Sequence, residues 1–421
     1  ILVKDGSDKH EVHYYDIGDY LTRDDKLSIL RDKESILNID WQTIFPDKNN
    51  DWINQRDENY QTYSSMNTDI FTTSAPGVLT ARDFWTINFS QKNAFSNADR
   101  MVRNYNYELN SKNSLQEINT SEDYIKWSSS LKDLFKRKQT LSISESDVIE
   151  VMYRPFTKKY MSYKKGLIHR PAKWDEKYTF NTEVIYTTGV GISKDFSVLL
   201  INRIPNFHFM DTGKGYILTP KQNQSFFEIN SITESFSEKV GLKSNLVHYY
   251  VYGILHSKKF INRYANNLNK EIPRIPVVKD KDKYVKIGKK LADLHLNYEN
   301  FPAYEGINTV FKSDRPSYIV KKMKHPKRGQ LDTIIFNEDI VIKDIPERAY
   351  NYVVNGRPAI EWIIDQYQVK TDKKSGITDD PNNFSDDPKY ILNLLLSVIT
   401  VSMRTLELID ELPEFELLEK E

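Results

Sequence analysis

The sequence of 421 residues contains no cysteine. This absence excludes disulfides, thiol nucleophiles and thiolate zinc sites, and it agrees with a cytoplasmic protein. There is no Gly-rich loop ending in Lys-Ser or Lys-Thr, so an ATPase signature is missing. No two prolines are adjacent, so the Asp/Asn-Pro-Pro-aromatic motif of amino-methylating methyltransferases is missing too. We find neither a signal peptide nor an apolar run of about 18 residues, and we expect no membrane span.

A catalytic centre is also missing from the sequence. The eight histidines form no metal-ligand pattern, and no Ser/His/Asp set can be assembled. The pairs at 379–380 and 386–387, all Asp, are typical of a divalent-cation site or, more often, of loop and helix-cap chemistry. The stretch 189–193, Gly-Val-Gly-Ile-Ser, lacks the Gly-x-Gly-x-x-Gly pattern, so a tight turn is the better interpretation. We expect no catalytic residue and no metal site.

Charge is balanced in total but not along the chain. Lys plus Arg and Asp plus Glu both number 59, while residues 407–421 hold seven carboxylates against one lysine. The opposite excess lies in residues 154–177, where eight Lys and Arg are opposed only by Asp175 and Glu176. Cations interleaved with Tyr, Phe and Trp are typical of a nucleic-acid-binding surface. A β-hairpin with a solvated basic face is the alternative, and these residues alone do not decide between the two.

The pattern of elements predicts an α+β fold in three parts. Residues 1–145 are expected to be a connector of helices and loops, with a helix that Thr22 caps. Residues 146–345 are expected to be a β-rich domain with inserted helices, because short β-rich runs are punctuated by Gly and Pro. Residues 346–421 are expected to be a C-terminal helical segment. A hairpin is expected around Asn337-Glu338.

Individual elements follow from the periodicity of apolar residues. The expected strands are 84–89, 148–153, 159–163, 183–187, 196–201, 207–210 and 216–218. The expected helices are 92–109, 121–139, two within 237–269, 283–298, 346–366 and 388–411. The helix at 121–139 is expected to have Thr120 or Ser121 as its cap.

A second basic run, 313–330, has six cations opposed only by Asp314.

Several separated motifs resemble one family. In chain order they are Tyr153-Arg154-Pro155-Phe156 with Leu167-Ile168-His169-Arg170-Pro171; Tyr252-Gly253-Ile254-Leu255-His256-Ser257 with Arg263-Tyr264-Ala265; Glu271-Ile272-Pro273-Arg274-Ile275-Pro276; Leu291-Ala292-Asp293-Leu294-His295-Leu296; and Ser375-Gly376-Ile377 with Asp380-Pro381-Asn382. Together they resemble the C-terminal specificity region of type ISP restriction–modification enzymes. The resemblance runs from about Tyr15 to about Asn382.

The resemblance implies a role in recognition rather than in chemistry. Type ISP enzymes are large single polypeptides that join a nuclease, a helicase-like translocase, an adenine methyltransferase and a target recognition domain, and they act in phage defence. The β-rich middle of this chain would be the target recognition domain. The sequence begins with Ile, and we expect segments outside it to carry the reactive groups. Arg154 and Arg274, within the motifs, would be structural rather than base-reading.

The resemblance also implies partners and cofactors. The partners would be double-stranded DNA and the methyltransferase and helicase-like domains of the same polypeptide. This chain would need no cofactor, while the full-length enzyme would use S-adenosylmethionine, ATP and magnesium. The rival function is an interaction scaffold that docks the methyltransferase or the translocase.

Candidate DNA contacts come from the two basic runs and from loops between the expected strands. For phosphate contact they are Lys158, Lys159, Lys164, Lys165, Lys173, Lys322, Lys324 and Arg328. For base reading they are Ser193, Lys194, Arg203, Asn206, Lys214, Lys221, Gln222, Asn223 and Gln224. For each of these residues, an ordinary solvated side chain is the alternative.

Overall fold

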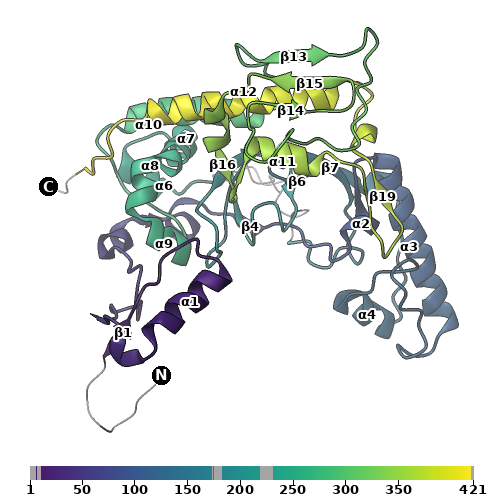
Figure 1. The fold of residues 1–421 in the computed structure, drawn as a ribbon. Helices are drawn as coiled ribbons and strands as arrows, with labels where there is room; N and C mark the ends of the chain where they lie inside the picture. The colour runs from purple at the N-terminus through teal and green to yellow at the C-terminus, as the bar shows by residue number, and fades with distance from the viewer. Residues whose placement is uncertain (1–5, 7–10, 173, 175–182, 219–230, 419–421) are drawn as a thin grey trace. The chain divides into compact units, whose positions relative to one another are not determined.

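The structure is a computed structural model, which describes residues 6, 11–172, 174, 183–218 and 231–418. The chain forms two compact units, Ile1–Tyr60 and Gln61–Glu421. Helices and several small sheets make up these units, so the predicted α+β fold class is confirmed (Figure 1). The predicted three-part division stays a prediction, and the two units divide the chain elsewhere, after Tyr60.

The N-terminal unit contains helix α1 (Arg23–Lys33) and the antiparallel strands β1 (Val12–Tyr14) and β2 (Gln42–Ile44). Thr22 caps α1, as predicted. Its hydroxyl accepts the Asp25 N–H at 3.2 Å, and the Asp25 carboxylate accepts the Thr22 N–H at 2.9 Å. These bonds satisfy amides that a first helical turn leaves without partners, which fixes where α1 begins. Helix α1 nevertheless buries none of its residues.

In the larger unit, a hairpin of β6 (Val148–Arg154) and β7 (Thr157–Ser162) forms the centre of a four-stranded sheet. The sheet order is β10-β6-β7-β5, with β10 (Ile204–Pro205) parallel to β6 and β5 (Ile87–Asn88) antiparallel to β7. Phe156 lies in the turn with a φ of 57°. The first basic run therefore starts as a hairpin, as its alternating pattern indicated.

A second four-stranded sheet has the order β4-β11-β8-β9. It consists of β4 (Ser74–Pro76), β11 (Lys214–Ile217), β8 (Val184–Thr187) and β9 (Val198–Ile201). All four residues of β8 and all four of β9 are buried. Apolar side chains of both sheets join one hydrophobic core, so the sheets stabilise each other.

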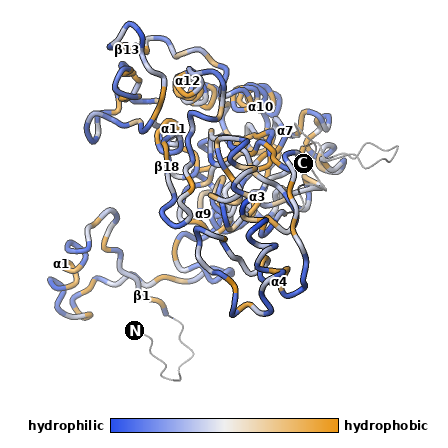
Figure 2. Tube along the Cα trace, turned by 90° about the vertical axis from the view of Figure 1, so that its right-hand side faces the viewer, coloured by the Kyte–Doolittle hydropathy of each residue, from blue (hydrophilic) through white to orange (hydrophobic). Residues whose placement is uncertain are grey.

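Helices α10 (Lys281–Leu296), α11 (Ala359–Gln366) and α12 (Tyr390–Asp410) contribute buried side chains to that core, and α7 (Ser244–His256) packs against α10. Helix α10 contacts both α7 and α12, and α12 also contacts α11. Figure 2 shows apolar stretches of chain where these helices lie together. The predicted helices at 283–298 and 388–411 are thus present as α10 and α12. Of the helix predicted at 346–366, only α11 is α-helical, because a turn at Asn355-Gly356 interrupts the segment.

Helices α7 and α10 cross at two glycines. A Cβ on Gly288 would lie 1.9 Å from the Tyr249 carbonyl oxygen, and a Cβ on Gly253 would lie 2.5 Å from that of Tyr284. Since both nearest atoms belong to the backbone, a side chain at either position would force the helices apart. This crossing explains why the Tyr-Gly-Ile-Leu-His-Ser motif needs its glycine.

Helix α12 is long and apolar enough to cross a membrane by length and composition. The most apolar 18-residue window has a mean hydropathy of 1.5, and 72% of it is buried inside the protein. Burial of this kind is typical of a core helix. The prediction from sequence overlooked this apolar run because single polar residues, such as Ser397 and Thr400, interrupt it. Their hydroxyls bond to the Tyr298 and Pro302 carbonyls at 2.6 and 2.7 Å.

Helices α3 (Gln91–Ser111) and α4 (Ser129–Lys136) pack around a separate hydrophobic cluster, and we call this part the α3–α4 lobe. Helix α3 matches the helix predicted at 92–109. Helix α4 is shorter than predicted, because the hydroxyl of Ser128 accepts the Leu131 N–H at 3.3 Å and starts the helix there. The buried cluster includes Trp85, Met101, Tyr105, Ile125, Leu131, Phe135, Leu167 and Ile377.

Two predicted strands are wrong in part or in whole. The stretch 84–89 begins as the short helix α2 (Asp83–Thr86) and becomes a strand only at β5. The stretch 207–210 is a turn, because the Asn206 side-chain oxygen accepts the His208 N–H at 2.9 Å and bends the chain.

The remaining elements are small. The expected hairpin around Asn337-Glu338 is present, and β13 (Asn308–Phe311) joins it to give the order β13-β15-β14. The other helices and strands are β14 (Ile334–Ile335), β15 (Ile340–Lys343), α6 (Glu234–Val240), α8 (Lys258–Arg263), α9 (Ala265–Lys270), β3 (Ser64–Ser65), β12 (Arg274–Ile275), β16 (Val353–Val354), β17 (Arg357–Pro358), β18 (Lys370–Thr371) and β19 (Thr378–Asp379).

Candidate nucleic-acid interface

The hairpin cations of the first basic run point into the protein rather than to its surface. The Lys158 amino group lies 2.5 Å from the Glu299 carboxylate and 3.9 Å from that of Glu150. Arg203, a predicted base reader, shares Glu150 at 2.8 Å. All of these side chains are at least three-quarters buried. The cations therefore hold β6, β7 and β10 to the segment after α10.

Lys159 lies in the core. Its side chain is 7% exposed, and its amino group lies 2.6 Å from the Asp379 carboxylate, whose other oxygen accepts the Phe89 N–H at 2.8 Å. Burial lowers the pKa of Lys159, and the Asp379 charge raises it again in part. This position opposes the prediction that Lys159 contacts phosphate. The Asp379 carboxylate therefore has a structural role. Its neighbour Asp380 accepts the Asn382 N–H and caps the short helical turn that follows.

Asn206 is buried as well, so its side chain is not available to read a base. Its oxygen accepts a bond from the Arg154 guanidinium at 3.0 Å. Arg154 also donates to the Tyr153 carbonyl at 2.6 Å. Arg274 donates to the Tyr63 carbonyl at 2.8 Å. Both arginines bond to carbonyl oxygens within the protein, in agreement with the structural role expected for them.

Two predicted base-reading loops lie together at one end of the second sheet. The Gly189 N–H donates to the Asp211 carbonyl at 3.2 Å, and the Lys194 amino group lies 2.5 Å from the Asp211 carboxylate. Ser193 is exposed in the same loop. Gly191 has a φ of 76°, so the stretch 189–193 is the tight turn that its pattern indicated. Contacts between loops distant in sequence give this end of the sheet a defined shape.

The other predicted contacts fall into two groups. Lys164 is half-buried and pairs with Asp147 at 2.9 Å, while Lys214 donates to the side-chain oxygen of Asn67. Lys165 and the cations of the second basic run are exposed, namely Lys322, Lys324 and Arg328. The predictions for Lys173, Lys221, Gln222, Asn223 and Gln224 fall outside the described residues.

The second basic run is held in place by buried neighbours. Val320 and Met323 are almost completely buried between the exposed lysines. The Lys324 N–H donates to the Ile335 carbonyl at 3.1 Å, and the Ile335 N–H donates back at 2.8 Å. The buried Val320 and Met323 and the bridge between Lys324 and Ile335 hold this part of the run against the protein. All six cations of this run are exposed.

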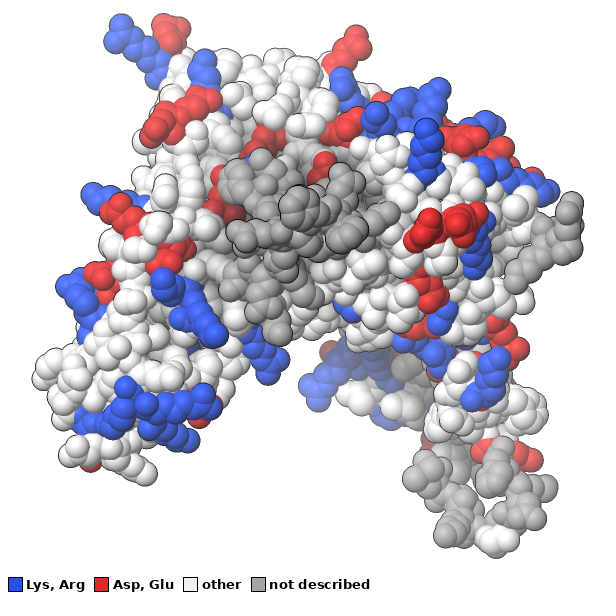
Figure 3. All heavy atoms as spheres, turned by 180° about the vertical axis from the view of Figure 1, so that it is seen from behind, with Lys and Arg blue, Asp and Glu red and all other residues white. Residues whose placement is uncertain are grey.

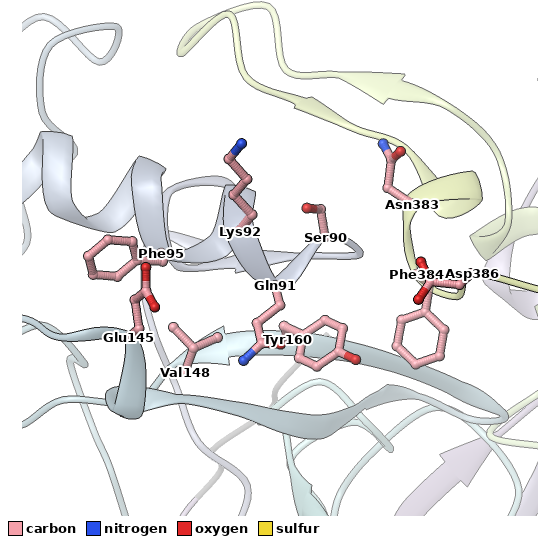
Figure 4. Close-up of a pocket in the computed structure, with 10 residues that line it drawn as sticks. All are labelled: Ser90, Gln91, Lys92, Phe95, Glu145, Val148, Tyr160, Asn383, Phe384 and Asp386. Atoms are coloured by element: carbon pink, nitrogen blue, oxygen red, sulfur yellow. The ribbon is translucent and has the colours of Figure 1, made fainter.

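A pocket of about 460 Å³ lies between the start of α3, strand β7 and the turn after Pro381. Figure 4 shows the Gln91 side chain running toward the Tyr160 ring, with Phe384 across the pocket. The Tyr160 and Phe384 rings are 5.5 Å apart. Lys92, Glu145 and Asp386 also line the pocket, so its charged lining is of mixed sign.

The described residues contain no group of three His, Cys, Asp or Glu side chains arranged to hold a metal ion. His256 and His295 are instead buried inside the protein. The His295 Nδ1 lies 2.6 Å from the Tyr252 hydroxyl, and its Nε2 lies 2.9 Å from the Thr405 hydroxyl. The Tyr252 hydroxyl in turn accepts the Leu200 N–H at 2.9 Å, which ties α7, α10, α12 and β9 together. Sequence patterns gave no signal for this network.

Comparisons with known proteins agree on one family. A family model described as "Type ISP C-terminal specificity domain" matches residues 69–394. The comparison with curated proteins gave no match. A structure of a nuclease-deletion mutant of the type ISP restriction–modification enzyme LlaGI in complex with a DNA substrate mimic is 53% identical, with a TM-score of 0.92. It matches over 99% of this chain and 34% of its own.

Two further structures are similar. The ATP-dependent type ISP restriction–modification enzyme LlaBIII bound to DNA is 45% identical over 97% of this chain and 28% of its own, with a TM-score of 0.90. A DrdV–DNA complex shares the fold with a TM-score of 0.81, at 21% identity over 97% of this chain and 44% of its own. This chain thus spans about a third of the length of its type ISP relatives. Because the family model covers most of the sequence, the chain belongs to the type ISP C-terminal specificity domain family.

Proposed function

We propose that this chain is the part of a restriction–modification enzyme that recognises a specific sequence in duplex DNA. The observation that carries the proposal is the match of residues 69–394 to a specificity domain. The geometry of the larger unit supports it. Exposed cations of the second basic run suit phosphates, and the paired loops at 189–195 and 206–213 suit base edges.

We assign different roles in DNA binding to the exposed cations, the paired loops and the buried ion pairs. Lys165, Lys322, Lys324 and Arg328 are exposed and would neutralise phosphates, which sets the register of the duplex. Exposed polar groups of the two paired loops, such as Ser193, would read base edges. The buried ion pairs around β6 and β7 would keep the platform rigid, so that the loops hold one geometry.

The proposal includes domains that lie outside this sequence. The chain would position DNA while other domains of the same polypeptide methylate adenine at N6 and cleave the DNA. Methylation of a base inside a duplex requires its extrusion, and this chain would hold the flanking duplex while that happens. S-adenosylmethionine, ATP and magnesium would serve those other domains, and the expected location is the cytoplasm.

Binding of the purified chain to labelled duplex DNA at several salt concentrations tests the proposal. Contacts with several phosphates make the logarithm of the binding constant fall linearly with the logarithm of the salt concentration, by about 0.9 for each contact. The exposed cations named above predict a slope of magnitude three or more by that rule. No binding at low salt, or binding that salt does not weaken, would contradict the proposal.

A second candidate function rests on the N-terminal unit. Large apolar side chains are exposed there: Tyr20 is 104% exposed, Leu37 88%, Phe45 72% and Trp52 55%. Exposed apolar residues in such number are typical of an interface. This unit would dock another domain of the same polypeptide. Double substitution L37S/F45S should then weaken association with the remainder of the enzyme, and added salt should leave that association unchanged.

A further inference from the structure

The α3–α4 lobe carries a basic surface that neither predicted run includes in full. We call it the lobe surface, and it consists of the exposed residues Lys132, Lys136, Arg137, Lys165 and Arg170. Three of these residues belong to α4 or follow it directly, and the other two belong to the turn after β7. Figure 3 shows Lys and Arg side chains gathered on the lobe, at lower left, with few acidic side chains among them.

The turn and the helix are in direct contact. A Cβ on Gly166 would lie 2.8 Å from a methyl carbon of Leu141 and 3.3 Å from one of Leu134. The His169 Nδ1 lies 2.9 Å from the hydroxyl of Ser130. Lys165 and Arg170 are therefore carried on a segment that packs against α4.

The buried side chain of Arg82 links the turn after β7 to the start of α4. Arg82 is 3% exposed, and its guanidinium donates to the carbonyl of Leu167 in the turn and to the hydroxyl of Ser128, the cap of α4. It also donates to the Lys126 carbonyl at 3.2 Å. No carboxylate among the described residues forms an ion pair with Arg82. Burial lowers its pKa to about 10, which leaves it charged at neutral pH.

The cations of the lobe surface are free to bind an external anion. Within the described part of the chain, Lys132, Arg137, Lys165 and Arg170 have no ion-pair partner, and Lys136 has only Asp133 at 3.8 Å. Both members of that pair are more than half exposed, so the attraction between them is weak. Several unpaired cations on a rigid support are what binding to a duplex backbone requires.

We propose that the lobe surface binds the phosphate backbone of duplex DNA, on a rigid support set by Arg82. This inference rests on the proposed function and extends it, because it assigns DNA contact to helix α4. Phosphate contacts carry no sequence information. The lobe surface would therefore increase the affinity for DNA and fix the position of the duplex. The loops at 189–195 and 206–213 would determine which sequence is recognised.

The test compares two double variants of the chain by duplex binding over a range of salt concentrations. K132A/R137A removes two cations of the lobe surface. K286A/K289A removes two exposed cations of α10 and serves as the matched control, since both pairs lie on or next to a helix and both change the net charge equally. We expect K132A/R137A to weaken binding and to lower the magnitude of the salt slope by about 1.8, at about 0.9 for each lost contact.

The outcomes separate this inference from the proposed function. A wild-type chain that binds DNA, with K132A/R137A matching K286A/K289A in affinity and slope, would overturn the role of the lobe surface alone. A wild-type chain that binds no duplex would overturn both. Circular dichroism of each variant verifies the fold. K165A in the turn should lower the slope by about 0.9 and checks the second half of the surface independently.

Discussion

Replacement of Arg82 by Met should loosen the α3–α4 lobe. The guanidinium bonds to two backbone carbonyls, those of Lys126 and Leu167, and to the hydroxyl of Ser128. Methionine fills a similar volume but donates no hydrogen bond. Each buried carbonyl left without a partner costs about 1–3 kcal/mol. Removal of a buried charge offsets part of that loss, so we expect a net destabilisation of about 3 kcal/mol for this lobe.

Hydrogen exchange of backbone amides is the suitable assay, because two compact units make a single unfolding free energy for the chain ambiguous. At about 1.4 kcal/mol for each factor of ten, the amides of α4 should exchange more than about 100-fold faster in R82M. Amides of α10, in the main core, serve as the internal control and should be unchanged. Equal exchange of α4 in wild type and R82M would refute the anchoring role of Arg82.

The remaining predictions concern the main core. K159M leaves the Asp379 carboxylate buried without its partner and should destabilise the larger unit by about 3–5 kcal/mol, whereas K159M combined with D379L should recover part of the loss, as urea unfolding would measure. G288A should cost more than about 3 kcal/mol in the same assay, because its Cβ would overlap the Tyr249 carbonyl; an unchanged midpoint would contradict the close helix crossing. Burial lowers the pKa of His256 to about 4, below the value of about 6.5 in an unfolded chain. The unfolded state therefore binds the proton first, and His256 alone should lower the stability by up to about 3 kcal/mol as the pH drops from 6.5 to 4. The H256N variant lacks this contribution, so its stability should fall less over the same pH range.

Local patterns predicted much of the secondary structure. The cap at Thr22, the hairpin of β6 and β7, and helices α3, α10 and α12 follow from signals within a few residues of sequence. The errors arose where a side-chain bond overrides the pattern. Asn206 bends a stretch whose apolar alternation indicated a strand.

The placement of the basic residues could not be predicted in the same way. Lys159 and Lys158 have the sequence pattern of surface cations, yet their carboxylate partners, Asp379 and Glu299, are far away in sequence. The sequence around a lysine in a strand does not indicate which distant segment will supply its carboxylate partner and bury it. Conversely, α4 contributes cations to a basic surface that only tertiary contacts through Arg82 bring together.

Methylome sequencing of cells that carry the full-length enzyme would show whether residues 189–224 read the DNA sequence. Residues 189–224 would be exchanged for the corresponding segment of a relative with a different target. We expect the methylated motif to change while methylation persists, because this segment supplies sequence readout and other domains supply the reaction. Methylation of the original motif by the exchanged enzyme would contradict the claim.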